Sequence, residues 1–327
     1  MSSHLIRGLA GDGIRIIAAD TTQLVKDARE RHSSAPTATA ALGRTLTAAL
    51  LLSHVVLKDS RDRVTIRFRG DGPLGGMIAD AGLDGSVRGY VGDPDVHLPL
   101  REDGKLDVGG AVGQGELEII RSHAPHGDPY SSSVDIVTGE VAEDIAIYLA
   151  MSEQIRSAVL LGVYLEGNNV VKAGGVLMQA LPDATDEELG QVEENVFGLG
   201  QLTEALRSGT LLEVVNRLSS GMKLDILTKD ALPLRFACRC SDGKALDSLA
   251  YFTPEERQEM IDEDGGAEVV CHWCGQKRWV PGERFAEISA NEIRCPDCGT
   301  LWYREGQART VRENETCSCG RTVTLPA

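Results

Sequence analysis

The chain has few basic residues for its size. Only 33 Lys and Arg face 49 Asp and Glu among its 327 residues, which leaves a formal net charge of −16 and a pI near 4.9. Proteins that bind nucleic acid or anionic membranes through counterion release need an excess of positive side chains. The composition therefore predicts an acidic globular protein with no nucleic-acid partner and no membrane partner.

Long hydrophobic runs are also missing. The most apolar stretch, residues 46–57, is interrupted by Ser53 and His54 and is shorter than the roughly 20 residues that a membrane-spanning helix needs. Charged residues such as Arg7 and Asp12 interrupt the N-terminus where a signal peptide would need an apolar core. We therefore expect a cytoplasmic protein, and its length suggests about two domains.

No recognisable catalytic constellation occurs in the sequence. The glycine-rich segment GDGPLGG at residues 70–76 lacks the Lys-Ser/Thr of a phosphate-binding loop, and Pro73 removes a backbone donor. The serines at 131–133 have no nucleophile-elbow context, and no paired carboxylates or activated nucleophile stand out. We therefore expect that the protein is not an enzyme.

Residues 1–182 combine strand and helix patterns. Apolar and charged residues alternate over 64–68, which is typical of a half-buried strand, and the run stops at a Gly-Asp-Gly-Pro turn sequence. The same reasoning predicts further elements: helices at 36–57 and 141–151, and a β-hairpin with strands at 158–165 and 170–181. These patterns predict an α/β or α+β core domain.

Residues 183–232 have the pattern of helices without strands. Two capping-box sequences, Thr185 with Glu188 and Thr210 with Glu213, each open an amphipathic stripe. Short helices broken by glycine must dock such a stripe on another surface. Two interpretations stay open: a helical spacer packed on the first domain, or a metastable switch segment whose stripe is covered in one state and exposed in another.

All eight cysteines lie in the C-terminal region, where they form four close pairs. The pairs are Cys238/Cys240, Cys271/Cys274, Cys295/Cys298 and Cys317/Cys319. In a reducing compartment such pairs indicate metal ligands or redox thiols and not a disulfide framework. Zinc takes four thiolates in a closed tetrahedral site, so eight cysteines predict two zinc sites.

Spacing alone does not decide which pairs share a zinc ion. Combining Cys271/Cys274 with Cys295/Cys298 gives a spacing close to that of zinc ribbons. Combining the pair at 238/240 with the pair at 271/274 encloses a longer segment, in which a helix around residues 254–260 would close the gap. A closed four-thiolate site usually has only a structural role. Here neighbouring cations favour the thiolate form of the cysteines, which makes the site a target for peroxide. These cations are Arg235, Arg239, Lys277 and Arg278.

Several motifs, taken together, resemble the 33 kDa heat-shock protein family of redox-regulated chaperones. They are GDGP at 70–73, VGQGELEI from Val112, the Ser-Glu-Gln at 152–154, AGGVLMQALP at 173–182, LRFACRCS at 234–241 and CHWCG at 271–275. The resemblance covers about residues 1–290. It implies an ATP-independent holdase with an α/β core at 1–182, a helical linker at 183–232 and a zinc-binding redox switch at 233–290.

The resemblance also implies a mechanism. The zinc ligands would be Cys238, Cys240, Cys271 and Cys274, and the reduced, zinc-loaded protein would be inactive. Oxidation would form the disulfides Cys238–Cys240 and Cys271–Cys274, release zinc and unfold the linker. The resulting form would bind unfolded client proteins and would tend to form a homodimer.

The chain departs from the usual family pattern after about residue 290. Residues 291–327 form an additional extension resembling a zinc ribbon, and a second zinc is expected at Cys295, Cys298, Cys317 and Cys319. Two rival functions remain: a zinc-ribbon adaptor, which the acidity of the chain disfavours, and a thiol oxidoreductase, which the lack of a thioredoxin-like context around the CxxC pairs disfavours.

Overall fold

The computed structural model describes residues 3–123, 129–228, 231–290, 292–294 and 301–304. The chain divides into two compact units, Met1–Cys238 (unit 1) and Arg239–Ala327 (unit 2). The expected mixed α/β core and the expected linker both fall within unit 1, and the described cysteines from Cys240 onward fall within unit 2.

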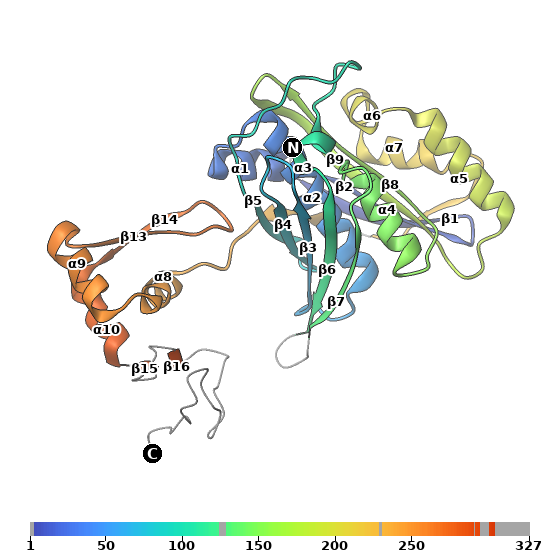
Figure 1. The fold of residues 1–327 in the computed structure, drawn as a ribbon. Coiled ribbons are helices and arrows are strands. Elements are labelled where there is room, and N and C mark those ends of the chain that lie inside the picture. The colour runs from blue at the N-terminus through green and yellow to red at the C-terminus, as the bar shows by residue number, and fades with distance from the viewer. Residues whose placement is uncertain (1–2, 124–128, 229–230, 291, 295–300, 305–327) are drawn as a thin grey trace. The chain divides into compact units, whose positions relative to one another are not determined.

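Two β-sheets dominate unit 1 (Figure 1). The first has the strand order β10-β1-β2-β9-β8, with β11 also paired to β1, and the second has the order β12-β5-β4-β3-β6-β7. The first sheet contains β1 (His4–Ala10), β2 (Ile14–Asp20), β8 (Ser157–Glu166), β9 (Asn169–Ala180), β10 (Leu224–Ile226) and β11 (Leu232–Pro233). The second contains β3 (Arg63–Gly70), β4 (Met77–Gly82), β5 (Ser86–Val91), β6 (Gly115–Ser122), β7 (Tyr130–Asp135) and β12 (Arg235–Phe236).

The central element of unit 1 is α2 (Pro36–Val56), which contacts strands of both sheets. Pro36 begins the helix, because its missing N–H would have no intrahelical partner at that position. Among the described residues, α2 alone is long and apolar enough to be considered as a membrane span, but 78% of its apolar window is buried inside the unit. That burial is what the core helix of a soluble domain shows. The remaining helices before the linker are α1 (Thr22–His32), α3 (Val108–Val112) and α4 (Ala142–Met151).

Most of the predicted elements of the first domain are confirmed. The strand predicted at 64–68 is β3, the predicted hairpin is β8 and β9, and the two predicted helices are α2 and α4. The GDGP turn packs against the segment before β6: the backbone N–H groups of Asp71 and Gly72 donate to the carbonyls of Gln114 and Val112. These two donors are therefore occupied within the fold.

The Gly-Gly pair in β9 allows helices to approach both faces of the first sheet. A Cβ on Gly175 would lie 2.7 Å from side-chain atoms of Thr47 in α2, whereas a Cβ on Gly174 would lie 2.7 Å from Leu206 in the linker. Because successive residues of a strand face opposite sides, α2 and the linker cover opposite faces of the same sheet. The linker is thus a fourth layer, after the second sheet, α2 and the first sheet.

Three helices of the linker dock their apolar stripes on this sheet. They are α5 (Asp186–Leu199), α6 (Leu202–Ser208) and α7 (Leu211–Leu218), and both predicted capping boxes are present at α5 and α7. Their buried residues form one cluster with sheet residues: Ile14, Ile16, Ala18, Val176 and Met178 on the sheet, and Val192, Leu199, Leu202, Ala205, Leu206, Leu211, Val214, Val215 and Leu218 on the helices. This docking agrees with the interpretation of a spacer packed on the first domain.

The prediction of a linker without strands is wrong. After α7 the chain forms β10 and β11, which pair with β1 and so extend the first sheet. The strand pattern was missed because β10 has three residues and β11 has two, too few to show a period-2 alternation. Hydrogen bonding to β1 holds β10 and β11 in the strand conformation, which such short segments would not adopt by themselves.

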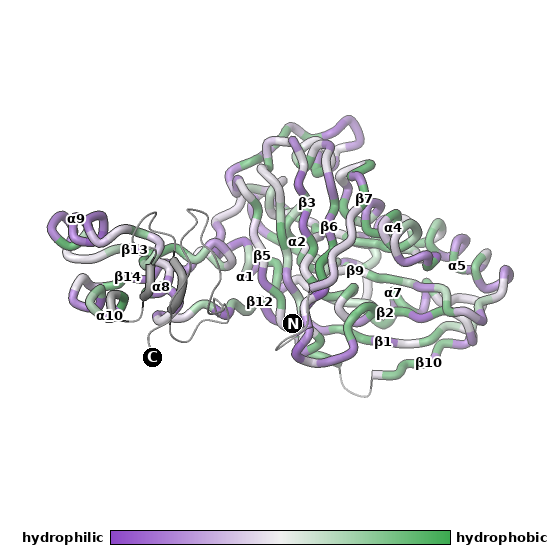
Figure 2. The backbone as a smooth tube through the Cα atoms, turned by 60° about the horizontal axis from the view of Figure 1, so that its bottom comes forward, coloured by the Kyte–Doolittle hydropathy of each residue, from purple (hydrophilic) through white to green (hydrophobic). Residues whose placement is uncertain are grey.

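A small apolar core holds the described part of unit 2 together. It consists of Ala245, Leu246, Leu249, Ala250, Val280, Phe285 and Ile288. The elements that contribute to this core or flank it are α8 (Asp242–Ser248), α9 (Pro254–Asp264), the hairpin of β13 (Gly266–Val270) and β14 (Lys277–Pro281), and α10 (Phe285–Ala290). The strands β15 (Glu292–Arg294) and β16 (Leu301–Arg304) follow and pair with each other. The helix expected around 254–260 is confirmed as α9, which is hydrophilic along most of its length (Figure 2).

The stability of unit 1 is expected to depend on pH through His54 in α2. Burial, followed by the nearby charge of Arg7, lowers the pKa of His54 from 6.5 to about 4. Between pH 6.5 and about pH 4, His54 is therefore protonated in the unfolded chain but neutral in the folded chain. The free energy of unfolding consequently decreases as the pH falls through this range. We expect the free energy of unfolding to decrease by about 2 kcal/mol between pH 7 and pH 5.

The measurement is chemical denaturation of the wild-type protein and of the variant His54→Gln at both pH values. The variant is expected to lose most of the pH-dependent difference in the free energy of unfolding. An unchanged difference in the variant would show that another group carries the pH dependence.

Candidate metal centre

Four cysteines converge in the structure. The sulfur atoms of Cys238, Cys240, Cys271 and Cys274 all lie within 4.8 Å of one another, and the four residues form no disulfide. The Sγ atoms of Cys240 and Cys274 are 3.6 Å apart. In a tetrahedral zinc site with Zn–S bonds of about 2.3 Å, neighbouring sulfurs lie about 3.8 Å apart. The spacing and the all-sulfur donor set fit a closed site for zinc or another thiophilic metal.

Local backbone geometry positions the second pair. Cys271 and Cys274 occupy the connection between β13 and β14, where the N–H groups of Cys274 and Gly275 both donate to the carbonyl of Cys271. Gly275 has a φ of 66°, a left-handed conformation that favours glycine over residues with a Cβ. The N–H of Cys271 donates to the carbonyl of Gln276 and closes the turn. The CHWCG sequence therefore forms a compact turn that directs both sulfurs to one side.

The burial of the site is uneven. Cys274 is only 1% exposed, whereas Cys238, Cys240 and Cys271 are partly exposed. His272, which stands between two ligand positions, is exposed and is not part of the sulfur cluster. A partly exposed thiolate site combines a closed coordination shell with access for a small oxidant.

One of the four expected cations contacts a sulfur atom through a described interaction. Nη2 of Arg278 lies 3.7 Å from Sγ of Cys240, and Nη1 of the same guanidinium pairs with Asp242. The contact with Cys240, followed by that with Asp242, raises the pKa of Arg278, so its positive charge is permanent. Lys277 instead pairs with Glu268, 2.9 Å away, on the β13–β14 hairpin.

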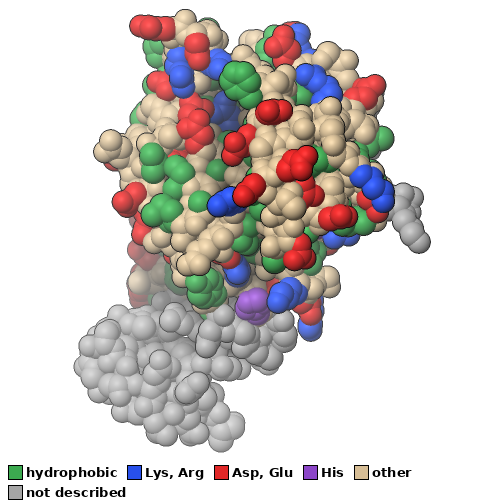
Figure 3. Space-filling view, turned by 90° about the vertical axis from the view of Figure 1, so that its right-hand side faces the viewer, with side chains coloured by type: hydrophobic (Ala, Val, Ile, Leu, Met, Phe, Trp, Pro, Cys, Tyr) green, Lys and Arg blue, Asp and Glu red, His purple; other side chains and the backbone are tan. Residues whose placement is uncertain are grey.

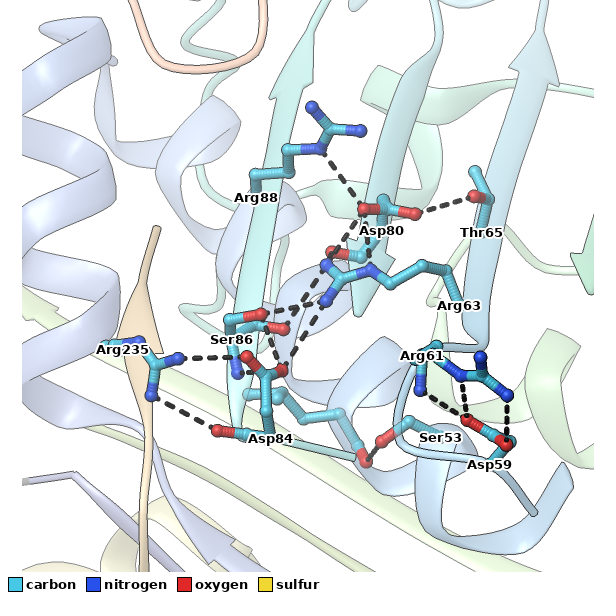
Figure 4. A network of polar contacts seen from close by, with 11 residues as sticks. Ser53, Asp59, Arg61, Arg63, Thr65, Asp80, Asp84, Ser86, Arg88 and Arg235 are labelled. Carbon is cyan, nitrogen blue, oxygen red and sulfur yellow. Dashed lines mark hydrogen bonds and ion pairs between the residues drawn. The ribbon is translucent and has the colours of Figure 1, made fainter. Parts of the chain in front are cut away.

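Arg235 has an acidic partner on the second-sheet side of unit 1, Asp84. It lies in β12, two residues before Ala237, and pairs with Asp84 at 2.9 Å (Figure 4). Burial by itself raises the pKa of Asp84, but hydrogen bonds from Ser86 and the charges of Arg235 and Arg63 lower it overall. Both partners of the Arg235–Asp84 pair are about half exposed, so the pair adds little stability.

Behind this pair lies a buried ion network that fixes the second sheet (Figure 4). Arg63 contacts Asp80 at 2.8 Å, and Arg88 contacts the same carboxylate at 3.1 Å. Thr65 donates to the other oxygen of Asp80. Every charge here has a partner, which buried charges require. The network is structural and supports β5, the strand to which β12 is attached in parallel.

Phe236 completes the attachment of the segment that leads to the first cysteine pair. Its ring packs edge-on against His32 at 6.0 Å, with Arg31 at 5.7 Å from the ring centroid. The N–H of Ala237 donates to the carbonyl of Val87. The sequence does not reveal this attachment, because a two-residue parallel strand leaves no recognisable pattern.

The four cysteines of the C-terminal extension, Cys295, Cys298, Cys317 and Cys319, lie outside the described residues. The backbone of the flanking strands is described: β15 and β16 pair antiparallel on either side of the CxxC sequence at 295–298. β13 and β14 flank the CxxC sequence at 271–274 in the same way.

Comparison with known proteins identifies the relatives of this fold and cysteine arrangement. A family model described as Hsp33 protein matches residues 3–280. This chain belongs to the Hsp33 family. A 33 kDa chaperonin of Thermus thermophilus is 50% identical, with 99% of this chain and 98% of the relative covered. A 33 kDa chaperonin of Deinococcus radiodurans is 49% identical, with 89% of this chain and 99% of the relative covered.

The fold agrees with a solved Hsp33 structure. The crystal structure of a 33 kDa chaperonin from Thermotoga maritima matches with a TM-score of 0.79 and 32% identity, covering 87% of this chain and 97% of that one. The relatives named chaperonin support a chaperone function for this Hsp33 chain. The alignment with the Thermus relative takes in almost the whole chain, so it reaches into the C-terminal extension, whereas the Deinococcus alignment covers less of the chain.

Proposed function

We propose that this chain is an ATP-independent holdase chaperone whose activity is controlled by oxidation of a zinc centre. The observation that carries the proposal is the convergence of four cysteines, three of them partly exposed, in a chain that belongs to a chaperone family. In the reduced state Cys238, Cys240, Cys271 and Cys274 bind one zinc ion and the linker stays docked. The functional parts are the core at 1–182, the linker at 183–232, the switch at 233–290 and the extension at 291–327.

Oxidation removes the ligands from the metal. Two molecules of peroxide and four protons convert the four zinc-bound thiolates into two disulfides and four waters, and Zn²⁺ is released. The disulfides are Cys238–Cys240 and Cys271–Cys274. Zinc contributes on the order of 10–16 kcal/mol to small metal-stabilised folds, more than the seven-residue apolar core of unit 2 can replace. Unit 2 therefore unfolds when the metal leaves.

The linker is the second element of the switch. Once unit 2 is unfolded, the two-residue strands β11 and β12 are the last ordered elements after the linker, and each is paired over only two residues, with β1 and β5. Release of α5, α6 and α7 exposes their stripes and the sheet face beneath them to client proteins. Acidic side chains lie among the hydrophobic ones on the face seen in Figure 3, and this charge keeps a client complex soluble.

The proposal extends to the rest of the chain. Cys295, Cys298, Cys317 and Cys319 hold a second zinc ion in a ribbon-like extension, supported by the antiparallel strands β15 and β16 on either side of the CxxC sequence. The oxidised protein binds unfolded clients as a homodimer, acts in the cytoplasm and performs no enzymatic turnover.

The test combines client aggregation with metal release. Reduced and peroxide-treated protein are compared in a light-scattering assay with a heat-denatured client, while a chromophoric chelator follows zinc. Suppression of scattering only after oxidation, in step with zinc release, is the expected result. Equal suppression by the reduced, metal-filled protein would refute redox control. Turnover of a dithiol substrate would point to an oxidoreductase, and an RNA mobility shift would point to an adaptor.

A further inference from the structure

The first sheet of unit 1 ends in a long apolar edge strand. β8 has ten residues, SAVLLGVYLE, and among the described residues it pairs only with β9. The other long edge strand of unit 1, β7, has the polar sequence YSSSVD, and β10 on the opposite edge of the first sheet has three residues. Edge strands are usually short, charged or covered, because unpaired backbone groups attract other extended chains. β8 is neither short nor charged along most of its length.

The register shows which backbone groups of β8 point outward. The N–H of Ala180 donates to the carbonyl of Arg156, which makes these two residues a hydrogen-bonded pair at the start of the hairpin. Hydrogen-bonded and non-hydrogen-bonded pairs alternate along an antiparallel ladder. Continuing this alternation through the register of β8 and β9 makes residues 157, 159, 161 and 163 non-hydrogen-bonded, so their N–H and C=O groups point away from β9.

Three helices contact β8, and among the described residues no further strand pairs with its outer edge. α2 and α4 contact β8, and so does α6, which belongs to the linker on the opposite face of the sheet. A Cβ on Gly162 would lie 2.4 Å from the side chain of Thr203 in α6, so the linker lies directly on this strand. Although helices contact this strand, its first five residues are only partly buried. Their exposure comes from the outer edge.

We propose that β8 is a docking edge for an extended apolar segment of an unfolding client protein, which adds to the first sheet as a further antiparallel or parallel strand. This inference rests on the proposed holdase function and names the surface that performs it. The unpaired N–H and C=O groups recognise any extended backbone, whatever its sequence, which suits a chaperone with many clients. Apolar side chains on the added strand would gain contacts with the sheet faces next to Val159 and Leu160.

The linker limits this docking in the inactive state. Every second side chain of an added strand would project over the sheet face that α6 covers. On β8, α6 already covers this face at Gly162. When α6 undocks, the apolar face that includes Val176 and Met178 becomes continuous with the free edge of β8. A client segment can then pair its backbone with the edge of β8 and also bury its apolar side chains on the uncovered sheet face. Client affinity therefore rises, although the edge of β8 itself does not change.

Amide hydrogen exchange read residue by residue tests the pairing on the oxidised full-length protein. The probe is reduced, carboxymethylated α-lactalbumin, a permanently unfolded protein without thiols. The amides of Val159, Leu161 and Val163 are expected to exchange at least tenfold more slowly in the complex, whereas those of Ala158 and Leu160, already bonded to β9, change little. Unchanged exchange at the outward amides, in a protein that still suppresses client aggregation, would overturn the docking edge and leave the holdase proposal standing.

Two variants give an independent check. Val159→Pro removes one outward N–H without breaking the ladder to β9, and is expected to weaken binding of the same probe about tenfold. Ser133→Pro makes the matched change at an outward N–H of the polar edge β7 and is expected to leave binding unchanged. Equal effects of the two variants would refute the assignment. Protection of the outward amides that grows with protein concentration in the absence of client would also refute it, because the partner would then be a second copy of the chain.

Discussion

Replacing Cys274 with serine is expected to abolish metal binding at the first cysteine cluster and to make the reduced protein active. Cys274 is the most buried of the four sulfurs and is held by the turn that closes the β13–β14 hairpin. A serine hydroxyl is a poor substitute for a thiolate ligand, so most of the zinc-derived stability, on the order of 10–16 kcal/mol in comparable sites, is lost. That loss exceeds or equals the entire stability of a small domain.

The measurements are zinc content, protease sensitivity of residues 239–290, and suppression of client aggregation under reducing conditions. The double variant Cys295→Ser/Cys298→Ser is the control: it is expected to keep the zinc bound at Cys238 and to stay inactive until oxidised. A Cys274→Ser protein that retains this metal would show that the sulfur cluster is not the binding site. A metal-free variant that remains inactive would show that zinc loss does not drive the switch.

The sequence predicted the elements of unit 1 whose patterns are long. α2, α4, β3 and the β8–β9 hairpin were found because each repeats its periodicity over several residues. The capping boxes of α5 and α7 were found because the Thr and Glu side chains act locally, within one turn of each other. Information that is contained in neighbouring residues can be read without the fold.

The sequence does not predict which distant segments contact each other in the fold. The sequence shows the apolar stripes of the linker, but their docking on Ile14 and Ile16 depends on contacts between residues more than 150 positions apart. The strands β11 and β12 form because they pair with the edges of β1 and β5, and no local sequence pattern predicts this pairing. The same applies to the cysteines: spacing left two pairings open, and the chain path brings the pairs at 238/240 and 271/274 together.

The docked linker makes a second strong prediction, which separates the linker from the metal. Leu218 in α7 is fully buried against the first sheet, together with Leu211, Val214 and Val215. Replacing Leu218 with aspartate places a carboxylate in this apolar contact without a partner, which costs several kcal/mol unless the helix moves into water. An eight-residue helix is not stable by itself, so α7 is expected to undock and to unfold.

The expected result for Leu218→Asp is a reduced protein that retains its zinc and nevertheless suppresses client aggregation. Zinc content, light scattering, and trypsin cleavage after Arg207 and Arg217 measure the three consequences separately. Leu212→Asp is the matched control, because Leu212 lies in the same helix but is 48% exposed, and its substitution is expected to leave the linker docked. If the zinc-loaded Leu218→Asp protein showed new cleavage sites but no activity, exposure of the linker and the sheet would be insufficient. Oxidation of the cysteines would then have to contribute more than release of the linker.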